Sequence, residues 1–410
     1  MVCIKAKPVL SVWMLILLAV AGNRALFGAD FFKARESALK PGRWQLGPFQ
    51  IFPTITLDNL GYTDNVYRYA SDPQPGWMAD IGVNIKAVSV IGRRFVLVLE
   101  GHPYYSYFST VDTERALNHS LNARVYTWLG GIHLVYSVDY ASLRWRPTNE
   151  FAAKVRNNYT TQRLEADIGN HSALFLTVYA GLSNLDFSDE GYMSRYDPEI
   201  RLNRTEQTAG VKLNLPLFTA TLLSLQAELS DFDFDYSIER DGRSLLTALN
   251  LRFPEIGHLT GNASLGYKRY FPDNPAYSEF STMYGSGHVA YRFLRRMRLG
   301  IDYNLDNYFS FISPEFYYNQ KTAKAALDYY MSRNLRLGFS YLRGRYDYRQ
   351  LADGALRFRD ENQYIEFRVV FRLAGTTGVG LSFRREEWDS QRINLQRSYY
   401  FIGGYVTHDF

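Results

Sequence analysis

Few side chains in this sequence are spaced for catalysis or for metal binding. His119 and Ser120 are adjacent in a segment of alternating residues, so they point to opposite faces and cannot act as a base and its nucleophile. Asp231, Asp233 and Asp235 could offer carboxylates to calcium, but they lack the spacing of a defined calcium loop, and a polar turn is the plainer interpretation. The seven histidines show no metal-ligand spacing. The sequence therefore predicts no catalytic residue, no metal and no cofactor, and it does not indicate an enzyme.

Charged residues recur instead at alternating positions, with apolar residues on the opposite parity. The basic members are Lys86, Arg124, Arg252, Arg292, Arg336, Arg368 and Arg384, and the acidic members are Asp139, Glu228, Asp302 and Glu366. Aromatic residues on the same parity are Tyr126, Tyr179, Tyr284 and Tyr364. If these positions line a water-filled interior, opposed charges could select solutes by charge and the tyrosines could stack on sugar rings. The alternatives are a salt-bridged wall that only stiffens the protein, and tyrosines that pack at strand ends.

The elements that must hold these side chains are β-strands. Clear period-two segments include residues 77–87, 117–125, 132–140 and 365–373, each with one apolar and one polar face. The chain has 32 Tyr and 27 Phe with a mean hydropathy of −0.26, which does not indicate a helical membrane protein. The sequence predicts an all-β fold, a single transmembrane antiparallel up-and-down β-barrel of about 18 strands, with 16 as the alternative count.

The connections between these segments alternate between short and long. Short turns fall near residues 91–94, 129–131 and 332–334, whereas the longest polar connections are predicted at residues 186–202 and 344–361. Short periplasmic turns and long extracellular loops are typical of outer-membrane barrels, and an even strand count puts both ends of the barrel on the periplasmic side. The two longest connections are the candidates to fold inward and narrow the interior.

The first residues are typical of a secretory signal. Lys5 and Lys7 precede a short apolar run, and the small residues near Ala21 predict a signal peptide over residues 1–21, with Ala25 and Ala29 as alternative cleavage positions. A membrane anchor is the alternative. Residues 30–47 are then expected to form a periplasmic segment and residues 48–410 the transmembrane barrel. The formal net charge of +5 is too small to indicate a nucleic-acid partner.

The last residues form one more period-two segment that ends on an aromatic side chain. Tyr400, Ile402, Val406 and His408 share one parity before Phe410. Such a strand gains most if it pairs with the first strand, because closure removes both exposed edges. This ending resembles the closing strand of bacterial outer-membrane barrels, and the resemblance implies that Phe410 is an assembly signal read by the barrel-assembly machinery. A soluble β-sandwich or propeller is the alternative to the barrel.

The start of the predicted barrel carries a second resemblance. Residues 44–53 (Trp-Gln-Leu-Gly-Pro-Phe-Gln-Ile-Phe-Pro), followed by residues 61–67 (Gly-Tyr-Thr-Asp-Asn-Val-Tyr), are similar to the first strand of the porin-2-like outer-membrane β-barrel families. Members resemble porins, and some are associated with exopolysaccharide production and export. The resemblance implies localisation in the bacterial outer membrane, contact with its lipid and no catalytic residues.

Two functional hypotheses follow from these patterns. The first is a porin-like channel for small polar solutes, among which a saccharide is one candidate. The family resemblance also links this hypothesis to exopolysaccharide export. The second is a plugged structural or adhesive barrel whose extracellular loops bind a partner. The first predicts stable conductance in a lipid bilayer, whereas the second predicts none.

Overall fold

A computed structural model describes most of the chain. The described residues are 35–36, 44–68, 72–92, 94–146, 150, 154–169, 173–188, 198–217, 221–256, 258–311, 316–373, 375–392 and 396–410. The predicted signal peptide and its alternative cleavage positions lie outside them.

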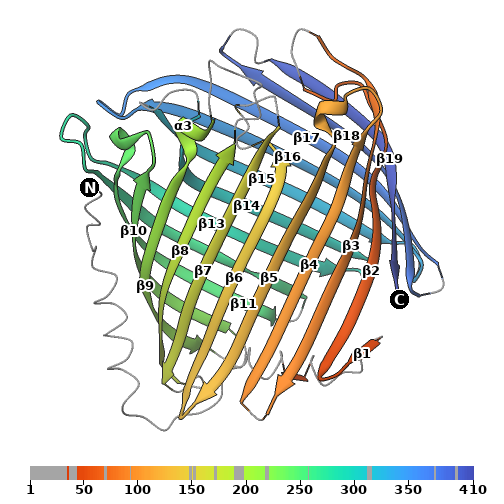
Figure 1. Cartoon of the computed structure of the whole chain (residues 1–410), viewed down its shortest axis with the longest axis horizontal. Helices are drawn as coiled ribbons and strands as arrows, with labels where there is room; N and C mark the ends of the chain where they lie inside the picture. The colour runs from red at the N-terminus through yellow and green to blue at the C-terminus, as the bar shows by residue number, and fades with distance from the viewer. Residues whose placement is uncertain are drawn as a thin grey trace.

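The structure is a ring of antiparallel strands (Figure 1). A three-residue strand, β1 (Trp44–Leu46), precedes the ring. The first half of the ring contains β2 (Phe49–Thr63), β3 (Gly76–Ile91), β4 (Phe95–Phe108), β5 (Ala116–Leu129), β6 (Ile132–Trp145), β7 (Val155–Gly169), β8 (Phe175–Ser188), β9 (Arg204–Leu217) and β10 (Thr221–Phe234). The second half contains β11 (Gly242–Ile256), β12 (Leu259–Pro272), β13 (Phe280–Phe293), β14 (Met297–Phe309), β15 (Phe316–Tyr330), β16 (Leu335–Gln350), β17 (Leu356–Leu373), β18 (Thr377–Ser390) and β19 (Arg397–Asp409).

Each strand of the ring pairs with its neighbours in sequence, and β19 pairs with β2 to close the sheet. The 18-stranded antiparallel barrel confirms the predicted fold class and the larger of the two strand counts. The short strand β1 pairs with β2 as an addition that the sequence did not predict within residues 30–47.

The closing seam brings backbones unusually close. Gly61 of β2 is paired with Gly403 of β19, and a Cβ added at Gly61 would lie 2.3 Å from the Ile402 carbonyl oxygen. The pairing shifts register beside this point, where Asn59 has a positive φ of 51°. Glycine is therefore required at the seam because a larger residue would meet backbone rather than a flexible side chain.

The longer connections contain three short helices. Two are 3-10 helices, η1 (Asp112–Glu114) and η2 (Ile238–Arg240), and one is an α-helix, α3 (Pro198–Leu202). The prediction of a long loop at residues 344–361 was wrong. Strand β16 continues to Gln350 and β17 begins at Leu356, so the connection between them is short. Charged residues there occupy both faces of continuing strands, which hides the strand pattern in the sequence.

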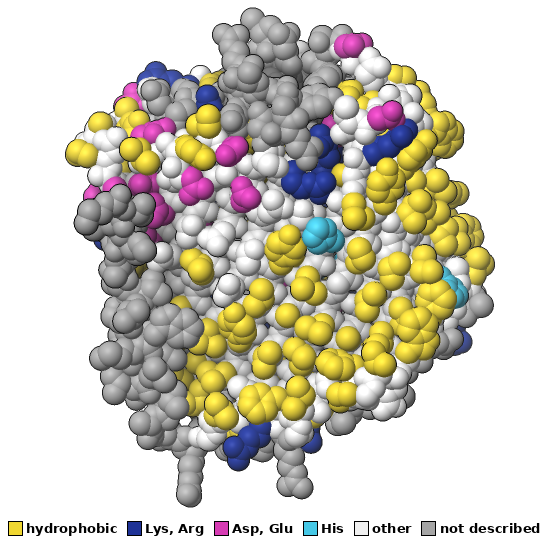
Figure 2. Space-filling model, in the orientation of Figure 1, with side chains coloured by type: hydrophobic (Ala, Val, Ile, Leu, Met, Phe, Trp, Pro, Cys, Tyr) yellow, Lys and Arg dark blue, Asp and Glu magenta, His cyan; other side chains and the backbone are white. Residues whose placement is uncertain are grey.

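The outer surface of the ring is apolar over a broad belt. Exposed side chains such as Trp77, Leu225, Leu265 and Leu381 share the outward parity of their strands. Figure 2 shows one side of this surface, with hydrophobic side chains over its lower and right-hand parts and charged ones toward its upper and lower margins. A continuous exposed apolar belt of this kind is stable in contact with lipid. Within the described residues, no helix has the length and apolar character needed to cross a membrane.

The end of the chain packs at the margin that carries the short turns. The backbone N–H of Phe410 donates to the carbonyl of Pro53 at 3.3 Å, and its ring lies 6.1 Å from that of Trp44. The Thr54 hydroxyl donates to the Asp409 carboxylate at 2.7 Å. These contacts fix the last residues to the start of β2, while the assembly role of Phe410 stays a prediction.

Candidate functional site

The strand register places the predicted charged positions and the four predicted tyrosines on the inner face of the wall. On β5 and β6, for example, Asn122 is paired with Asp139 and Arg124 with Ser137. Leu121, on the opposite face of β5, is exposed on the outer surface, so these paired residues face inward. The same parity continues around the ring through the pairs of β10, β13, β16 and β18 with their neighbours. The direct contact of these side chains with a solute remains a prediction.

Several of the predicted inner charges form ion pairs with residues on the same face. Lys86 lies 2.7 Å from Glu100, and Arg336 lies 3.9 Å from Asp328. The Arg368 guanidinium is 3.6 Å from Glu366 on the same strand. Partly exposed ion pairs of this kind contribute little to stability. The cations are the more exposed partners, with Arg336 at 37% and Arg368 at 36%.

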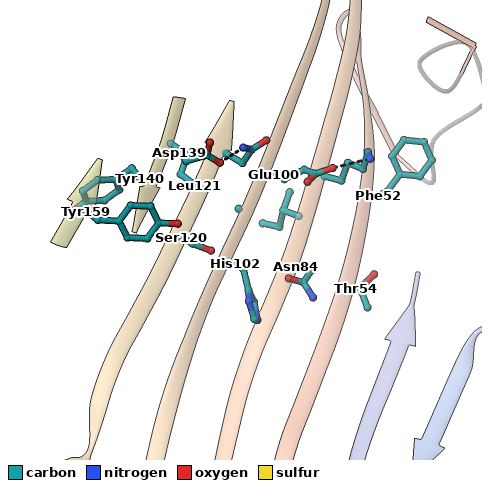
Figure 3. A pocket seen from close by; sticks show the side chains of 14 residues that line it. Phe52, Thr54, Asn84, Glu100, His102, Ser120, Leu121, Asp139, Tyr140 and Tyr159 are labelled. Atoms are coloured by element: carbon teal, nitrogen blue, oxygen red, sulfur yellow. Dashed lines mark hydrogen bonds and ion pairs between the residues drawn. The ribbon is translucent and has the colours of Figure 1, made fainter. Parts of the chain in front are cut away.

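A recess of about 450 Å³ lies in the inner wall across strands β2 to β7 (Figure 3). Its rim is polar, with the Lys86–Glu100 pair at one side and the Asn122 amide donating to the Asp139 carboxylate at the other. His102 lies between them in the same recess. The recess presents both donors and acceptors but no nucleophile with an aligned base, so its chemistry is that of binding a hydrophilic solute rather than of catalysis.

Tyr179 differs from its prediction as an aromatic lumen residue. Its side chain is completely buried, and its hydroxyl donates to Glu228 at 2.7 Å. The Arg163 guanidinium lies 4.0 Å from its ring centroid, with the Lys212 ammonium 5.2 Å away. The interpretation of Tyr179 as a platform for sugar rings was therefore wrong, because neighbouring cations already cover the ring.

The extracellular connections meet across the mouth of the barrel. The carboxylate of Glu150, in the connection between β6 and β7, accepts from the Ser310 hydroxyl at 2.6 Å and from the Phe311 N–H at 2.7 Å. Ser310 and Phe311 follow β14, and β15 lies eight strands from β7 in a ring of 18. Figure 1 shows β6 and β7 on the near wall and β14 and β15 behind them. These contacts therefore span the opening and narrow it.

A buried arginine holds two further connections to this bridge. Arg240 of η2 donates to the Arg201 carbonyl at 3.0 Å and to the Ser310 carbonyl at 2.5 Å, and its side chain is fully buried. Burial lowers the pKa of Arg240 to about 9, while the nearby Glu150 carboxylate acts in the opposite direction. The guanidinium therefore stays charged at neutral pH. Below it, Phe311 packs with the apolar side chains Val155, Phe187 and Leu202.

Four cations gather beside this bridge and form what we call the basic cluster: Arg68, Arg146, Lys154 and Arg397. Arg68 pairs with Glu386 at 3.0 Å, and its guanidinium lies 4.0 Å from the centre of the Tyr399 ring. Arg146 donates to the Val66 carbonyl at 3.1 Å.

Within the basic cluster, burial and mutual repulsion act on the charges. Burial lowers the pKa of Lys154 to about 8, and repulsion from Arg146 adds to that effect. The Glu114 carboxylate, 3.7 Å away, opposes the decrease. Burial also lowers the pKa of Arg146, which Arg68 and Arg397 repel. The carboxylates that act on these four cations are those of Glu114, Glu386, Asp80 and Asp360, so mutual repulsion among the cations is partly offset.

The basic cluster was missed by the sequence-based prediction. Arg68, Arg146 and Lys154 lie in connections, where no periodicity relates a residue to the interior. Arg397 has the inward parity of β19, so extending that strand back from Tyr400 could have found it. In the described part of the chain, no group of His, Cys, Asp and Glu side chains could hold a metal ion.

Comparisons with known proteins agree with this geometry. The model of the family described as putative beta-barrel porin 2 matches residues 41–401. The fold is similar to Pseudomonas aeruginosa OccK2 (OpdF), with a TM-score of 0.53, 11% identity, and coverage of 89% of this chain and 98% of that one. It is also similar to P. aeruginosa OpdO and OpdK. OpdO gives a TM-score of 0.51 at 12% identity, over 88% of this chain and 97% of the other. OpdK gives 0.50 at 10% identity, over 88% and 98%. No curated protein matches the chain in sequence.

Proposed function

The chain belongs to the putative beta-barrel porin 2 family, and we propose that it is an outer-membrane channel for small hydrophilic solutes with a preference for anions. The family and the fold are those of a channel in the bacterial outer membrane, not of an enzyme. The observation that carries the preference for anions is the basic cluster at the narrowed mouth.

The basic cluster is positioned to act on solutes at the entrance. Charges in a confined, partly desolvated opening act over a longer range than charges in bulk water, because less solvent screens them. Arg146 and Lys154 are half-buried and repel each other, and the carboxylates of Glu114, Glu386, Asp80 and Asp360 offset part of the positive charge. An anion that enters here gains favourable interactions that a cation lacks, which supports selection by charge.

The contacts across the mouth favour small solutes over polymers. We expect a polysaccharide chain to need the contacts of Glu150 with Ser310 and Phe311 to open, because these contacts cross the mouth. Export of exopolysaccharide, implied by the family resemblance, therefore remains a second candidate that requires movement of these connections. Besides membrane lipid, we propose as partners small polar solutes, including saccharides, and the barrel-assembly machinery through Phe410.

Two similar channels guide the choice of solute. The crystal structure of OccK2 (OpdF) is a complex with glucuronate, and that of OpdK contains vanillate. Both molecules carry a carboxylate, and glucuronate is also a sugar acid. We therefore choose glucuronate as the probe of an acidic solute for this chain.

Planar-bilayer recording tests the proposal. Purified protein should give stable open-channel steps, a reversal potential of the anion-selective sign in a KCl gradient, and a current that glucuronate reduces. Arg252→Glu together with Arg368→Glu should shift the reversal potential toward cations, because both side chains have the inward parity. Arg343→Glu, on the outward face of β16, is the matched control and should leave it unchanged.

The outcomes separate the hypotheses. Persistent silence of folded protein would refute the channel and favour the plugged or adhesive barrel. Cation selectivity of the unmodified protein would refute the preference for anions alone. An unchanged reversal potential in the double variant would remove Arg252 and Arg368 from the pore lining.

A further inference from the structure

The outward face of the wall becomes basic toward the extracellular end of β15, β16 and β17. Going up β16, the outward side chains are Leu335, Leu337, Phe339, Tyr341, Arg343, Arg345 and Asp347. The change from apolar to charged comes directly after Tyr341. Below it, the rings of Phe339 and Phe367 lie 4.9 Å apart on the same outward face. The first charged residues therefore lie at the upper edge of the lipid-facing belt, at the level of lipid headgroups.

The register of the strands places like charges directly opposite one another. Lys321 of β15 is the ladder partner of Arg345 of β16, and Arg343 is two residues from Arg345 on the same face. Like charges in directly opposed positions destabilise a sheet unless an anion lies between them. On the other side of β16, Arg345 has Glu361 as its ladder partner, so carboxylates offset part of this repulsion and a bound anion could offset the rest.

The carboxylates present neutralise only part of this charge. Asp347 lies 3.0 Å from Arg345, 2.7 Å from Arg359 and 3.9 Å from Lys321, and its own side chain is only 7% exposed. Glu361 lies 2.8 Å from Arg343. Four cations therefore share two carboxylates. Lys321, Arg343 and Arg345 remain 48%, 59% and 40% exposed on the outer surface.

The strand on the other side of β17 adds carboxylates rather than cations. On β18, Arg385 pairs with Glu387, and Asp389, the ladder partner of Glu361, accepts from the amide of Gln396. The excess is thus confined to the β15–β16 side. We call Lys321, Arg343, Arg345 and Arg359 the outer basic patch.

We propose that the outer basic patch binds the phosphate group of a lipid headgroup in the outer leaflet. Guanidinium groups match phosphate oxygens with paired N–H donors, and the patch offers two exposed guanidinium groups and one ammonium. The lipid's acyl chains would lie against Tyr341, Phe339 and Phe367 directly below, which a free phosphate could not use. Basic residues near a membrane surface attract anionic headgroups. The buried Asp347 holds three of the cations in place without occupying the outer surface.

The test uses the purified full-length protein in detergent micelles and lipid A, a phosphorylated acylated disaccharide, as the probe. Binding is measured by native mass spectrometry with three ligands, namely lipid A, its dephosphorylated form and inorganic phosphate. Lys321→Gln with Arg345→Gln should weaken lipid A binding about 30-fold, the ratio that corresponds to ~1 kcal/mol for each cation. Lys321→Arg with Arg345→Lys keeps both charges and should keep the affinity.

A matched control lies on the same outward face. Arg243 and Arg269 are 59% and 53% exposed, and each has its own carboxylate, Asp231 and Glu279. Arg243→Gln with Arg269→Gln should change lipid A binding less than twofold. Heat-modifiable migration on a gel confirms that each variant is folded.

Three results would overturn the proposal. These are unchanged lipid A affinity in Lys321→Gln with Arg345→Gln, an equal loss in the control variant, or equal binding of dephosphorylated lipid A. Inorganic phosphate binding as tightly as lipid A would show a site for free phosphate instead. Because the patch faces outward, single-channel conductance should stay the same in every variant, so this test fails or succeeds independently of the channel proposal.

Discussion

Glu150 offers the most direct test of the contacts across the mouth. Its carboxylate is buried and accepts hydrogen bonds from the Ser310 hydroxyl and from the Phe311 N–H. Glu150→Ala removes both acceptors and leaves two donors to find water. Glu150→Gln keeps one acceptor oxygen and places an amide N–H₂ where the other donor points. We expect both variants to release the connection after β14, with alanine having the larger effect.

The magnitude follows from the number and type of bonds. A hydrogen bond to a charged group contributes about 1.5–3 kcal/mol, so loss of both would cost roughly 3 kcal/mol or more. A change of about 3 kcal/mol shifts the ratio of released to bridged conformations by roughly 150-fold. The apolar contacts of Phe311 with Val155, Phe187 and Leu202 remain and limit the release. Glu150→Gln should shift the ratio by about tenfold, because one bond is lost and one is kept.

Single-channel recording at fixed voltage is the assay. Glu150→Ala should raise the mean open conductance and add rapid fluctuations between levels, because the released connection alternately narrows and clears the opening. Ser310→Ala removes one of the same hydrogen bonds, so its effect combined with Glu150→Ala should be less than the sum of the two. Asp112→Asn is the control, since its carboxylate is exposed and pairs within its own connection with Arg115.

The reasoning would be refuted if Glu150→Ala had the conductance and current noise of the unmodified protein. Equal changes in Asp112→Asn would instead assign the effect to loss of a negative charge near the mouth. Strict additivity of Ser310→Ala and Glu150→Ala would show that the two side chains act separately.

Three further predictions concern charge, closure and assembly. Lys154, with its pKa lowered to about 8, should be about 90% charged at pH 7 and about 10% charged at pH 9, so anion selectivity should fall between these values and fall less in Lys154→Gln. Gly61→Ala should lower the free energy of unfolding by roughly 1–3 kcal/mol in urea titrations. Gly101→Ala is the control and should have no such effect, because a Cβ there meets open space. Equal unfolding midpoints of the two variants would contradict the seam geometry. Phe410→Ala should reduce the folded protein recovered from outer membranes, and normal recovery would exclude an assembly role for this ring.

The faces of the strands could be predicted from the sequence because the side-chain period of a strand is two. Residues 77–87 and 365–373 alternate cleanly, and the structure places them on β3 and β17 with the apolar parity outward. The same rule placed Lys86 and Glu366 on the inner face. The rule does not predict which side chains contact one another across strands. It therefore did not predict that the Arg163 and Lys212 cations lie over the Tyr179 ring, because these residues belong to three different strands.

The ends of strands and the contacts of the connections could not be predicted in this way. Residues 344–361 have charged side chains on both parities, so the amphipathic pattern disappears although hydrogen bonding continues to Gln350 and resumes at Leu356. Glu150 and Ser310 are 160 residues apart, and no local signal relates them. The alternating pattern predicts which face of the sheet a strand residue occupies, but it does not predict the path of a connection.

The two basic regions of the extracellular end therefore arise from different physical causes and can act independently. The basic cluster is held inward by connections and by burial, so its charges act on what enters the mouth. The outer basic patch is held outward by strand parity: Arg345 faces away from the interior, whereas the next residue, Tyr346, is buried inside it. A phosphate bound outside can stabilise the wall without occupying the solute path, so substitutions in one basic region should leave the measured property of the other unchanged.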